Sequence, residues 1–562
     1  MLNSVTLEDC MADYVPRTEL TTHRVENQPG METEGDLWRT DRMLRDAVAK
    51  FAPRWVEQRL EPLGQRLAAP EVANWGDQAN RFPPQLHAFD RYGRRLDEVD
   101  YHPGYHALMD LAIRDGWHAV AWEREHDGGH QAHIAALYLL TQAEPGFCCP
   151  ITMTHAAMPV LRHLRDGEAW QARLMGRDYD PTALPAWQKT TNTFGMAMTE
   201  KQGGSDVRRN STRAQPITVT GPGEWYRLEG HKWFCSAPMS DAFLTLAQTD
   251  DGLSCFLAPR FTPEGERNAI EIQRLKDKCG NRANASAEIE YAGAWAQLVG
   301  EPGRGVPAIL EMVQQTRLDA ATAPAGMMRQ ALREVWHHVQ ERTVFDRRLA
   351  DQPLMQRVVA DLAIETEASL LLAMRGARAM DRTTDDEHEA ALTRLIPALA
   401  KFWHNKRGPL FMAEAMECLG GVGYVEETPL ARLYREAPVN SIWEGSGNVI
   451  CLDVLRILDR HPASIAALRE ELNQARGHHP AFDAAVDSLD HRLAASSEQL
   501  QVEARWLAQR MAQTLQAALL IRHAPNAVAD TFCATRLKDA SPIFGVMPFD
   551  APIAPILERL NE

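Results

Sequence analysis

The chain has 562 residues, of which 45% are hydrophobic and 24% charged, so three or four globular domains are expected rather than one core. The sequence lacks both the roughly 18-residue apolar run of a membrane-spanning helix and a secretory signal pattern, which predicts a cytoplasmic protein with no membrane contact. A formal net charge of −16 argues against tight nucleic-acid binding by the surface as a whole, although a local basic patch is compatible with it.

Cysteine usage argues against both a disulfide framework and a zinc site. No two cysteines form a CxxC pair, and the adjacent Cys148 and Cys149 are poorly placed to bond each other. We therefore expect reduced, mostly buried thiols and no metal centre. The nine cysteines are Cys10, Cys148, Cys149, Cys235, Cys255, Cys279, Cys418, Cys451 and Cys533.

Residues 1–190 are expected to form an N-terminal helical domain with an extension. Stretches at 105–115 and 133–142 carry apolar side chains on one helical face, although Pro-rich loops interrupt the pattern.

Residues 191–305 have a different pattern, with short apolar runs instead of helical periodicity, which predicts a central β domain. Short apolar runs at 242–248 and 254–258 flank an Asp-Gly pair, which is typical of a hairpin. Further strands are expected at residues 224–234 and 287–291.

Helical patterns return in residues 306–456, which predict a helical bundle domain. Apolar residues recur at helical spacing between 354 and 373. A second long helix is expected at 392–417, where Pro397 and Pro409 could kink or split it. A third helix is expected at 449–458, and the helical pattern of residues 457–562 predicts an extra C-terminal helical domain.

The first chemical motif is the run MAMTEKQGGSD at residues 196–206. Its glycines and hydroxyl residues could bring backbone N–H groups and hydroxyls close to a flat polar ligand. The simpler alternative is a plain Gly-Gly turn. The second motif, GHKWFCS at 230–236, could cover a planar ring with an aromatic side chain, or could simply supply Trp233 or Phe234 to the core.

The third motif spans residues 417–448 and contains Glu444 after an apolar Ile-Trp pair. A carboxylate in an apolar pocket has a raised pKa, which suits the general base for a carbon acid. The alternative interpretation is structural, since Ser446 or Asn448 could cap the helix that begins near residue 449. Both interpretations can hold together.

In order and spacing, these motifs resemble the acyl-CoA dehydrogenase family. The matching segments are Met198–Asp206, Lys232-x-Phe234-x-Ser236, Arg342-x-x-Phe345, Leu419–Gly423 and Trp443–Ser446. The sequence is most similar to the AidB-like members, for example in MTEKQGGSDV and LYREAPVNSIWEGSGN. The resemblance implies an α+β multidomain fold: an N-terminal helical domain, a central β-barrel-like domain and a C-terminal four-helix bundle, with an extra C-terminal helical domain.

The resemblance also implies an FAD site between the β domain and the C-terminal helices. By analogy, Met198, Thr199, Ser205, Phe234 and Ser236 would contact the flavin or the adjoining phosphates, and Ser446 and Asn448 the phosphate and adenosine part. Arg342, Phe345, Gly420 and Gly421 would reach the FAD of a neighbouring subunit, which requires an oligomer, a homotetramer built as a dimer of dimers.

Glu444 stands at the position of the family's catalytic base, which removes the α-proton of an acyl-CoA. The other base position known in the family is Thr316 here, before Arg317, a candidate substrate-binding residue. Three cofactor-site positions depart from the usual pattern: a common Gln is Pro353, flanked by Gln352 and Gln356; another Gln is Glu417; and a Tyr is Trp443. FAD binding is still expected, whereas an efficient acyl-CoA reaction is not.

AidB-like proteins are associated with DNA binding and protection against alkylation. The C-terminal residues 461–562 contain nine Lys or Arg against twelve Asp or Glu, so this tail is not basic. Small basic clusters remain around residues 208–213, 342–348 and 401–407, and the simpler interpretation of each is a solvated face. We therefore expect weak, salt-sensitive, nonspecific binding of double-stranded DNA at best.

Three functions remain open from the sequence. The first is an FAD-containing, DNA-associated stress protein with at most low acyl-CoA dehydrogenase activity. The second is a metabolic acyl-CoA dehydrogenase that oxidises a short or branched acyl-CoA at the α,β bond. The third is a flavin-bearing scaffold without turnover.

Overall fold

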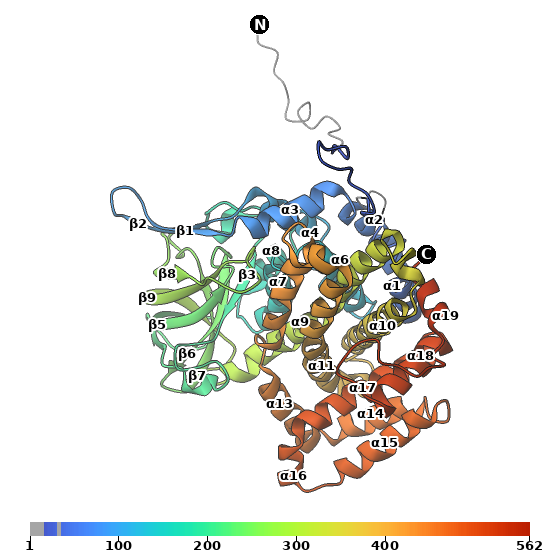
Figure 1. Cartoon of the computed structure of the whole chain (residues 1–562). Helices are drawn as coiled ribbons and strands as arrows, with labels where there is room; N and C mark the ends of the chain where they lie inside the picture. Colours follow the sequence, from blue (N-terminus) through green and yellow to red (C-terminus); the bar gives the residue numbers. More distant parts are fainter. Residues whose placement is uncertain (1–15, 31–34, 562) are drawn as a thin grey trace.

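The computed structural model describes residues 16–30 and 35–561. Helices flank a β domain on one side of the molecule, and the remaining helices form a large bundle that carries the C-terminal tail (Figure 1). Cys10 lies outside the described residues. Among the helices that the structure describes, none combines the length and apolar character needed to cross a bilayer.

The N-terminal region is helical apart from one exposed hairpin. The predicted helices at 105–115 and 133–142 are confirmed as α4 and α6, and α6 is buried on every side. The elements are α1 Arg42–Phe51, α2 Arg54–Leu67, α3 Pro70–Arg81, β1 Gln85–Phe89, β2 Arg95–Asp100, α4 Pro103–Arg114, α5 Val120–Glu123, α6 Gly129–Ala143, α7 Cys148–Leu161, α8 Glu168–Leu174 and the short turn η2 Ala186–Gln188.

The central domain is a barrel-like sheet. Strand β6 pairs with both β4 and β7, and the path β4-β5-β9-β7 completes the circuit, so these five strands close on themselves. The predicted hairpin is confirmed, since Thr249 pairs with Gly252 at its tip. The elements are β3 Phe194–Ala197, η3 Val207–Arg209, β4 Arg213–Pro216, β5 Trp225–Ser236, β6 Ala242–Thr249, β7 Gly252–Pro259, β8 Ile270–Leu275 and β9 Ser286–Val299.

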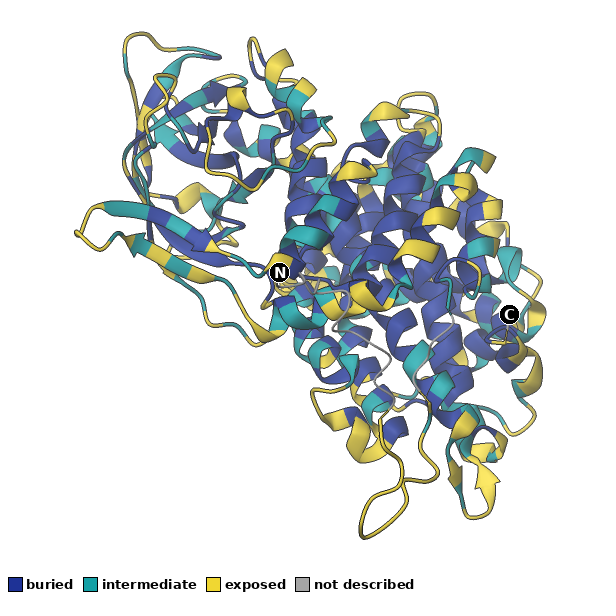
Figure 2. Cartoon of the chain, turned by 90° about the horizontal axis from the view of Figure 1, so that it is seen from above, coloured by how far each residue is buried: buried dark blue, intermediate teal, exposed yellow. Residues whose placement is uncertain are grey.

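Three long helices form the centre of the C-terminal bundle, and much of each of them is buried, in line with the dark blue helices of Figure 2. The helix expected at 392–417 is confirmed and is not split: α11 continues through Pro397 and Pro409 because tertiary packing outweighs the missing hydrogen bonds. The elements are α9 Gly305–Glu341, β10 Thr343–Val344, β11 Arg347–Arg348, η4 Leu349–Asp351, α10 Pro353–Asp381, α11 Glu387–Leu419, η5 Gly420–Tyr424, α12 Pro429–Glu436, η6 Ala437–Ser441 and α13 Gly447–Arg460.

The C-terminal tail packs on the bundle through apolar side chains and buried ion pairs. Arg536 contacts Asp361 at 2.6 Å and Glu365 at 2.9 Å, and Arg559 contacts Glu367 at 2.7 Å. One continuous hydrophobic core therefore includes both bundle and tail. The tail elements are α14 Pro462–Asn473, α15 Pro480–Leu493, α16 Ser497–Val502, α17 Ala504–His523, α18 Asn526–Phe532, η7 Cys533–Lys538 and α19 Ile553–Glu558.

Candidate active site

Glu444 lies in the loop between η6 and α13 and has an unusual backbone conformation. Its φ is 55°, a left-handed value that is costly for a residue with a side chain and typical of functional sites. The hydroxyl of Thr316 on α9 donates a hydrogen bond of 2.6 Å to Oε2 of Glu444. Burial raises the pKa of Glu444 above its ordinary value, although the Thr316 hydrogen bond and nearby cations oppose the rise.

Two cations hold the loop around Glu444 through backbone carbonyls. Arg317 donates from Nε to the Glu444 carbonyl at 3.3 Å and pairs with Asp453 at 2.6 Å. Lys401 on α11 donates from Nζ to the Gly445 carbonyl at 2.6 Å. Burial lowers the pKa of Lys401 to about 7. The loop is therefore fixed from both α9 and α11.

The MAMTEKQGGSD segment is attached to β5 by a buried ion pair. Lys232 Nζ lies 2.8 Å from Oε1 of Glu200, and both side chains are fully buried. Burial opposes ionisation of Glu200, but Lys232 and hydrogen bonds from residues 211 and 212 outweigh it and lower the pKa of Glu200 to about 2. The Trp233 amide also donates to the Thr199 carbonyl at 2.7 Å. These contacts bring Met198 and Thr199 to the same edge of the barrel as Phe234.

Phe234 and Ser236 follow on the same strand, β5. The Phe234 ring is 46% exposed, and Lys276 Nζ lies 4.7 Å from its centroid. Ser236 Oγ is 3.5 Å from Ser286 Oγ. Burial raises the pKa of the Cys149 thiol to about 12, and the Glu444 carboxylate adds to the rise, while Ser236 stabilises the thiolate. The Cys149 thiol therefore responds both to the barrel strand and to the loop that carries Glu444.

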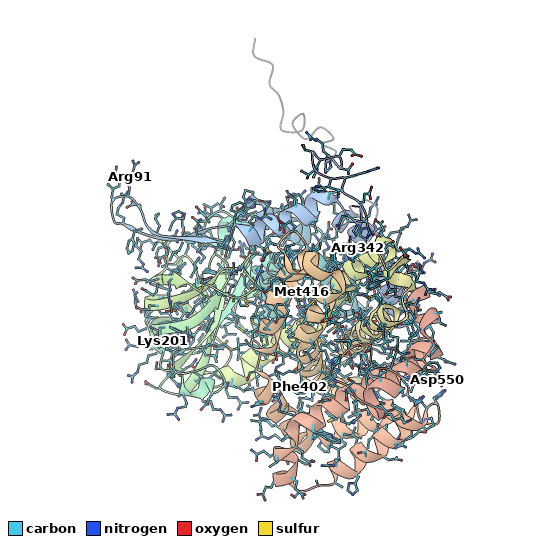
Figure 3. The ribbon with its side chains drawn as sticks, viewed as in Figure 1. Arg91, Lys201, Arg342, Phe402, Met416 and Asp550 are labelled. Atoms are coloured by element: carbon cyan, nitrogen blue, oxygen red, sulfur yellow. The ribbon has the colours of Figure 1, made fainter. Side chains whose placement is uncertain are left out.

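The predicted inter-subunit residues lie elsewhere. Arg342 donates to the Asn27 carbonyl, and Figure 3 shows it across the molecule from Lys201, which neighbours Thr199 in the barrel. Phe345 is 89% exposed at the tip of the β10–β11 hairpin, with a φ of 53°. Gln356, at the start of α10, donates to the Ala350 carbonyl at 2.8 Å. Arg342 is therefore not brought to the Met198–Phe234 edge of its own chain.

The Leu-Gly-Gly loop at the end of α11 is open. Gly420 has a φ of 65°, and within the part of the chain that the structure describes no atom lies within 4 Å of a Cβ built on Gly420 or Gly421. Glu417 is exposed one turn earlier. This surface has room for a ligand or a neighbouring chain.

The start of α13 carries the last predicted cofactor residues. Ser446 is the N-cap of α13, but its side chain makes no capping hydrogen bond, so the predicted cap is present by position and not by side-chain contact. Asn448 Oδ1 accepts from Arg505 at 2.8 Å. Trp443 Nε1 donates to Asn440 Oδ1 at 3.1 Å. The exposed Ser446 hydroxyl remains available at a helix N-terminus, where anions bind favourably.

A buried polar cluster beside the site escaped the sequence analysis. Asp319, one turn after Thr316 on α9, accepts from Thr152 at 2.8 Å and contacts His133 Nε2 at 3.0 Å. The His133 ring stacks on His155 at 3.7 Å. Burial lowers the pKa of His133, but Asp319 outweighs it and the net shift is upward. These residues come from three separate helices, α6, α7 and α9, and no motif in the sequence joins them.

One of the three basic clusters is not a surface feature. Lys401 and Arg407 are 2% and 5% exposed, because α11 is a central helix, and Arg407 pairs with Glu365 at 3.1 Å. The position of a Lys or Arg along a helix does not show whether its face of the helix is exposed, because a buried cation can pair with a carboxylate inside the protein. Arg208 and Arg209 are exposed, as are Arg347 and Arg348.

A β-barrel between helical domains, with a carboxylate in the loop before α13, is the architecture of acyl-CoA dehydrogenases. Three family models match consecutive parts of the chain: the adaptive response protein AidB N-terminal domain at 27–181, the acyl-CoA dehydrogenase middle domain at 195–294 and the acyl-CoA dehydrogenase C-terminal domain at 303–458. The chain belongs to the acyl-CoA dehydrogenase family, whose members are FAD-dependent oxidoreductases.

Within the family the chain is similar to AidB-like members. It is 45% identical to AidB of Escherichia coli (strain K12), over 85% of this chain and 88% of that protein. It is 32% identical to acyl-CoA dehydrogenase family member 11 of Caenorhabditis elegans, over 86% and 83% of the two chains. The structure of Caenorhabditis elegans ACDH-11 in complex with C11-CoA superposes with a TM-score of 0.81, at 28% identity and 92% coverage of both chains. The apo-form of Bd2924 gives 0.80, at 30% identity, over 90% of this chain and all of that chain.

Proposed function

We propose that this protein is an AidB-type, FAD-binding acyl-CoA dehydrogenase-like flavoprotein in which Glu444 removes the α-proton of an acyl-CoA at a low rate. We also propose a role in the response to alkylation stress, with weak, nonspecific DNA binding. The observation that supports the catalytic part best is Glu444 itself: a carboxylate with a strained backbone, a burial-raised pKa and a 2.6 Å hydrogen bond from Thr316.

The residues present fit an FAD. Phe234 exposes nearly half of an aromatic ring at the barrel edge, which suits stacking on a planar group. Ser446 offers a hydroxyl without a capping bond at the N-terminus of α13, which suits a phosphate. Met198, Thr199, Ser205 and Ser236 would line the ring and its phosphate side, with Trp443 and Asn448 at the helical side. Bound FAD would supply the acceptor for the hydride that leaves the β-carbon.

Residues of this chain account for the removal of the α-proton from the acyl-CoA. A base for the α-carbon of a thioester works best when its pKa approaches the operating pH, and burial shifts Glu444 in that direction. Thr316 opposes the shift and holds one carboxylate oxygen, so that Oε1 is left to accept the proton. Arg317 and Lys401 fix the loop backbone on either side of Glu444 and so fix its side chain in the site.

Low activity is proposed because of the departures from the family pattern. Trp443 is bulkier than the usual Tyr beside the base and narrows the space for an acyl group. Glu417 and Pro353 replace glutamines at positions that would face the cofactor of a neighbouring subunit. Arg317, the candidate substrate contact, is already paired with Asp453 at 2.6 Å, which lowers its availability for an anionic substrate.

A homotetramer, arranged as a dimer of dimers, is proposed from the second group of cofactor residues. Arg342 lies across the molecule from the MAMTEKQGGSD segment, and the Phe345 ring is 89% exposed (Figure 3). An exposed aromatic on a strained hairpin is costly in an isolated chain and favourable at an interface. Gln356, Glu417, Gly420 and Gly421 would complete the site from the same neighbouring subunit.

Weak DNA binding is proposed because the tail has few free cations. Most of its arginines pair with carboxylates: Arg469 with Asp490, Arg476 with Asp487, Arg492 with Glu503, Arg522 with Glu471, Arg536 with Asp361 and Arg559 with Glu367. Phosphate binding would have to compete with these pairs. The exposed Arg208 and Arg209 beside the barrel are the better candidates for contacts with a duplex.

The catalytic proposal is tested by anaerobic bleaching of the flavin absorbance with a panel of straight and branched acyl-CoAs. Slow bleaching is expected for wild type and for Glu427→Gln, an exposed control, while Glu444→Gln should bleach at least about 100-fold more slowly. Equal rates for wild type and Glu444→Gln would contradict the role of Glu444. No bleaching by any acyl-CoA in the panel would favour a scaffold without turnover.

The alternative is a metabolic acyl-CoA dehydrogenase for a short or branched acyl-CoA. One observation favours an acyl-CoA as the ligand, without indicating its chain length: the ACDH-11 structure, similar over 92% of this chain, is a complex with C11-CoA. Under this alternative, one acyl-CoA in the panel would bleach the flavin at the speed of an ordinary metabolic enzyme, with turnover of about 1–1,000 per second.

A further inference from the structure

We propose that the cavity between the N-terminal helical domain and the β-barrel is a binding site for a small organic carboxylate, held by Arg260. The cavity has a volume of about 340 Å³ and lies between the β2–α4 segment, the loop at 179–183 and the end of β7. Its size is within the range of ligand pockets, roughly 300–1,000 Å³. Its lining includes Tyr101, Tyr105, His106, Tyr179, Met239 and Arg260.

Arg260 is the cation of this cavity without a matched anion. It is 7% exposed, directly after β7, and its Nη1 donates to the Met239 carbonyl at 2.8 Å. Its Nη2 is buried and has no hydrogen-bond partner among residues 16–30 and 35–561. Burial lowers the pKa of Arg260 to about 10, so the guanidinium is still charged at neutral pH. A buried charge that lacks a partner is costly, and a bound carboxylate would remove that cost.

The acidic residues near Arg260 already have partners of their own. Asp241 lies 2.8 Å from Lys189, and Glu98 lies 2.8 Å from Arg267. Asp180 accepts from the amide and hydroxyl of Thr182. At the rim, Asp100 contacts His87 at 2.9 Å. These carboxylates already have partners, so none of them is free to pair with Arg260, and the carboxylate that matches it would have to come from a ligand.

A second donor without a partner belongs to another residue that lines the cavity. Tyr101 Oη is buried and, in the described part of the chain, has no hydrogen-bond partner, while its ring stacks on Tyr105 with centroids 4.3 Å apart. His106 and Tyr179 bond to each other at 2.9 Å and so need no ligand. Arg260 and Tyr101 therefore offer donors for a carboxylate, and Met109 and Pro150 offer apolar surface for its hydrocarbon part.

Two residues that line the cavity are sequence neighbours of residues near the proposed flavin site. Pro150 follows Cys149 and Ala237 follows Ser236, and both Pro150 and Ala237 line the cavity. A carboxylate could therefore come from a free small acid or from the far end of a dicarboxylic acyl-CoA. The second source rests on the proposed function, whereas the first does not.

The binding test is calorimetric titration of FAD-loaded protein with glutarate, and with neutral glutaramide as the probe that lacks the charge. Glutarate should bind wild type and Arg227→Gln, an exposed barrel arginine that does not line the cavity, and glutaramide should bind neither. Arg260→Gln should weaken glutarate binding about tenfold or more, and Tyr101→Phe, which removes one hydroxyl, several-fold.

Absence of glutarate binding at millimolar concentration would overturn the site and indicate a water-filled cavity. Equal affinity of wild type for glutarate and glutaramide would also overturn it. So would an unchanged affinity for glutarate in both Arg260→Gln and Tyr101→Phe. If Arg260→Gln does not fold, Tyr101→Phe decides alone.

The two sources are separated by flavin bleaching with glutaryl-CoA and butyryl-CoA. If the acyl-CoA supplies the carboxylate, Arg260→Gln should raise the glutaryl-CoA concentration needed for half-maximal bleaching about tenfold and leave the butyryl-CoA value unchanged. If a free acid is the ligand, both values stay unchanged while glutarate binding is lost. Failure of both acyl-CoAs to bleach wild type would exclude glutaryl-CoA as the source and leave the glutarate titration as the test of this site.

Discussion

The Thr316 hydroxyl donates a 2.6 Å hydrogen bond to Oε2 of Glu444, across 128 positions of sequence. This contact joins α9 to the loop before α13 and acts on the charge state of the carboxylate as well as on its position. Burial raises the pKa of Glu444 and this hydrogen bond lowers it, so the side chain's ionisation depends on the balance between the two.

Replacement of Thr316 by Val should move the acid limb of the pH–rate profile toward higher pH. The hydrogen bond stabilises the charged carboxylate, so its loss raises the pKa of Glu444 further and leaves less of the base ionised at neutral pH. The measurement is the rate of flavin bleaching against pH. Thr322→Val, which removes a buried hydroxyl bonded to the Leu318 carbonyl on the same helix, should leave the limb in place. An unshifted limb in Thr316→Val would contradict this role.

Lys401 should make the free energy of unfolding depend on pH in the neutral to alkaline range. Burial lowers its pKa from 10.5 to about 7 in the folded protein. Between these values the unfolded chain binds more protons than the folded one, so the free energy of unfolding from this group rises as pH increases from about 7 to 10 and is lowest below 7. Chemical denaturation at several pH values should therefore show wild type gaining stability relative to Lys401→Met over this range. The variant Lys50→Met, at an exposed lysine, should show the same pH dependence of stability as wild type. If the stability of Lys401→Met ran parallel to that of wild type over this pH range, the lowered pKa of Lys401 would be refuted.

Arg536 should be far more important for stability than a surface arginine of the same tail. Its removal leaves Asp361 and Glu365 buried without their shared cation, which costs about 3–5 kcal/mol. Replacement of Arg492, whose ion pair with Glu503 is partly exposed, should lower the free energy of unfolding by less than about 1 kcal/mol. Urea denaturation of Arg536→Met and Arg492→Met makes the comparison directly. Similar losses in the two variants would argue against a tail fixed by its buried ion pairs.

Phe345→Ala should weaken assembly and cofactor retention without unfolding the chain. The ring is 89% exposed and so contributes little to the core of its own subunit. Light scattering should show smaller particles, and the FAD-to-protein absorbance ratio should fall. Tyr92→Ala, 71% exposed at the tip of the β1–β2 hairpin, serves as the control. Unchanged mass and FAD content in Phe345→Ala would count against the proposed inter-subunit contact.

Fluorescence anisotropy with random duplex DNA should show weak binding at low salt that disappears at moderate salt, because few phosphates are neutralised. Arg208→Gln/Arg209→Gln should reduce it further, whereas Arg469→Gln, already paired with Asp490, should have little effect. Absence of binding at low salt would remove DNA from the proposed function.

The sequence predicted the elements whose pattern is local. The β6–β7 hairpin follows from apolar runs around an Asp-Gly turn, and α10 follows from helical periodicity. The helix predicted at 392–417 is confirmed as α11, but local rules left open whether Pro397 and Pro409 split it, because they do not include the packing of a central helix.

Glu444 was identified from its motif, but Thr316 as its partner, Lys401 as a buried lysine and Arg260 as an unmatched cation were not. Each depends on which distant segments the fold brings together.

The Glu200–Lys232 ion pair has a consequence for cofactor exchange. Because these two fully buried side chains already join the MAMTEKQGGSD segment to β5, that half of the proposed flavin site would be assembled as the barrel folds. Capture of FAD then requires little ordering of the barrel, so the ligand-free form should keep its shape and be refilled simply by adding the cofactor.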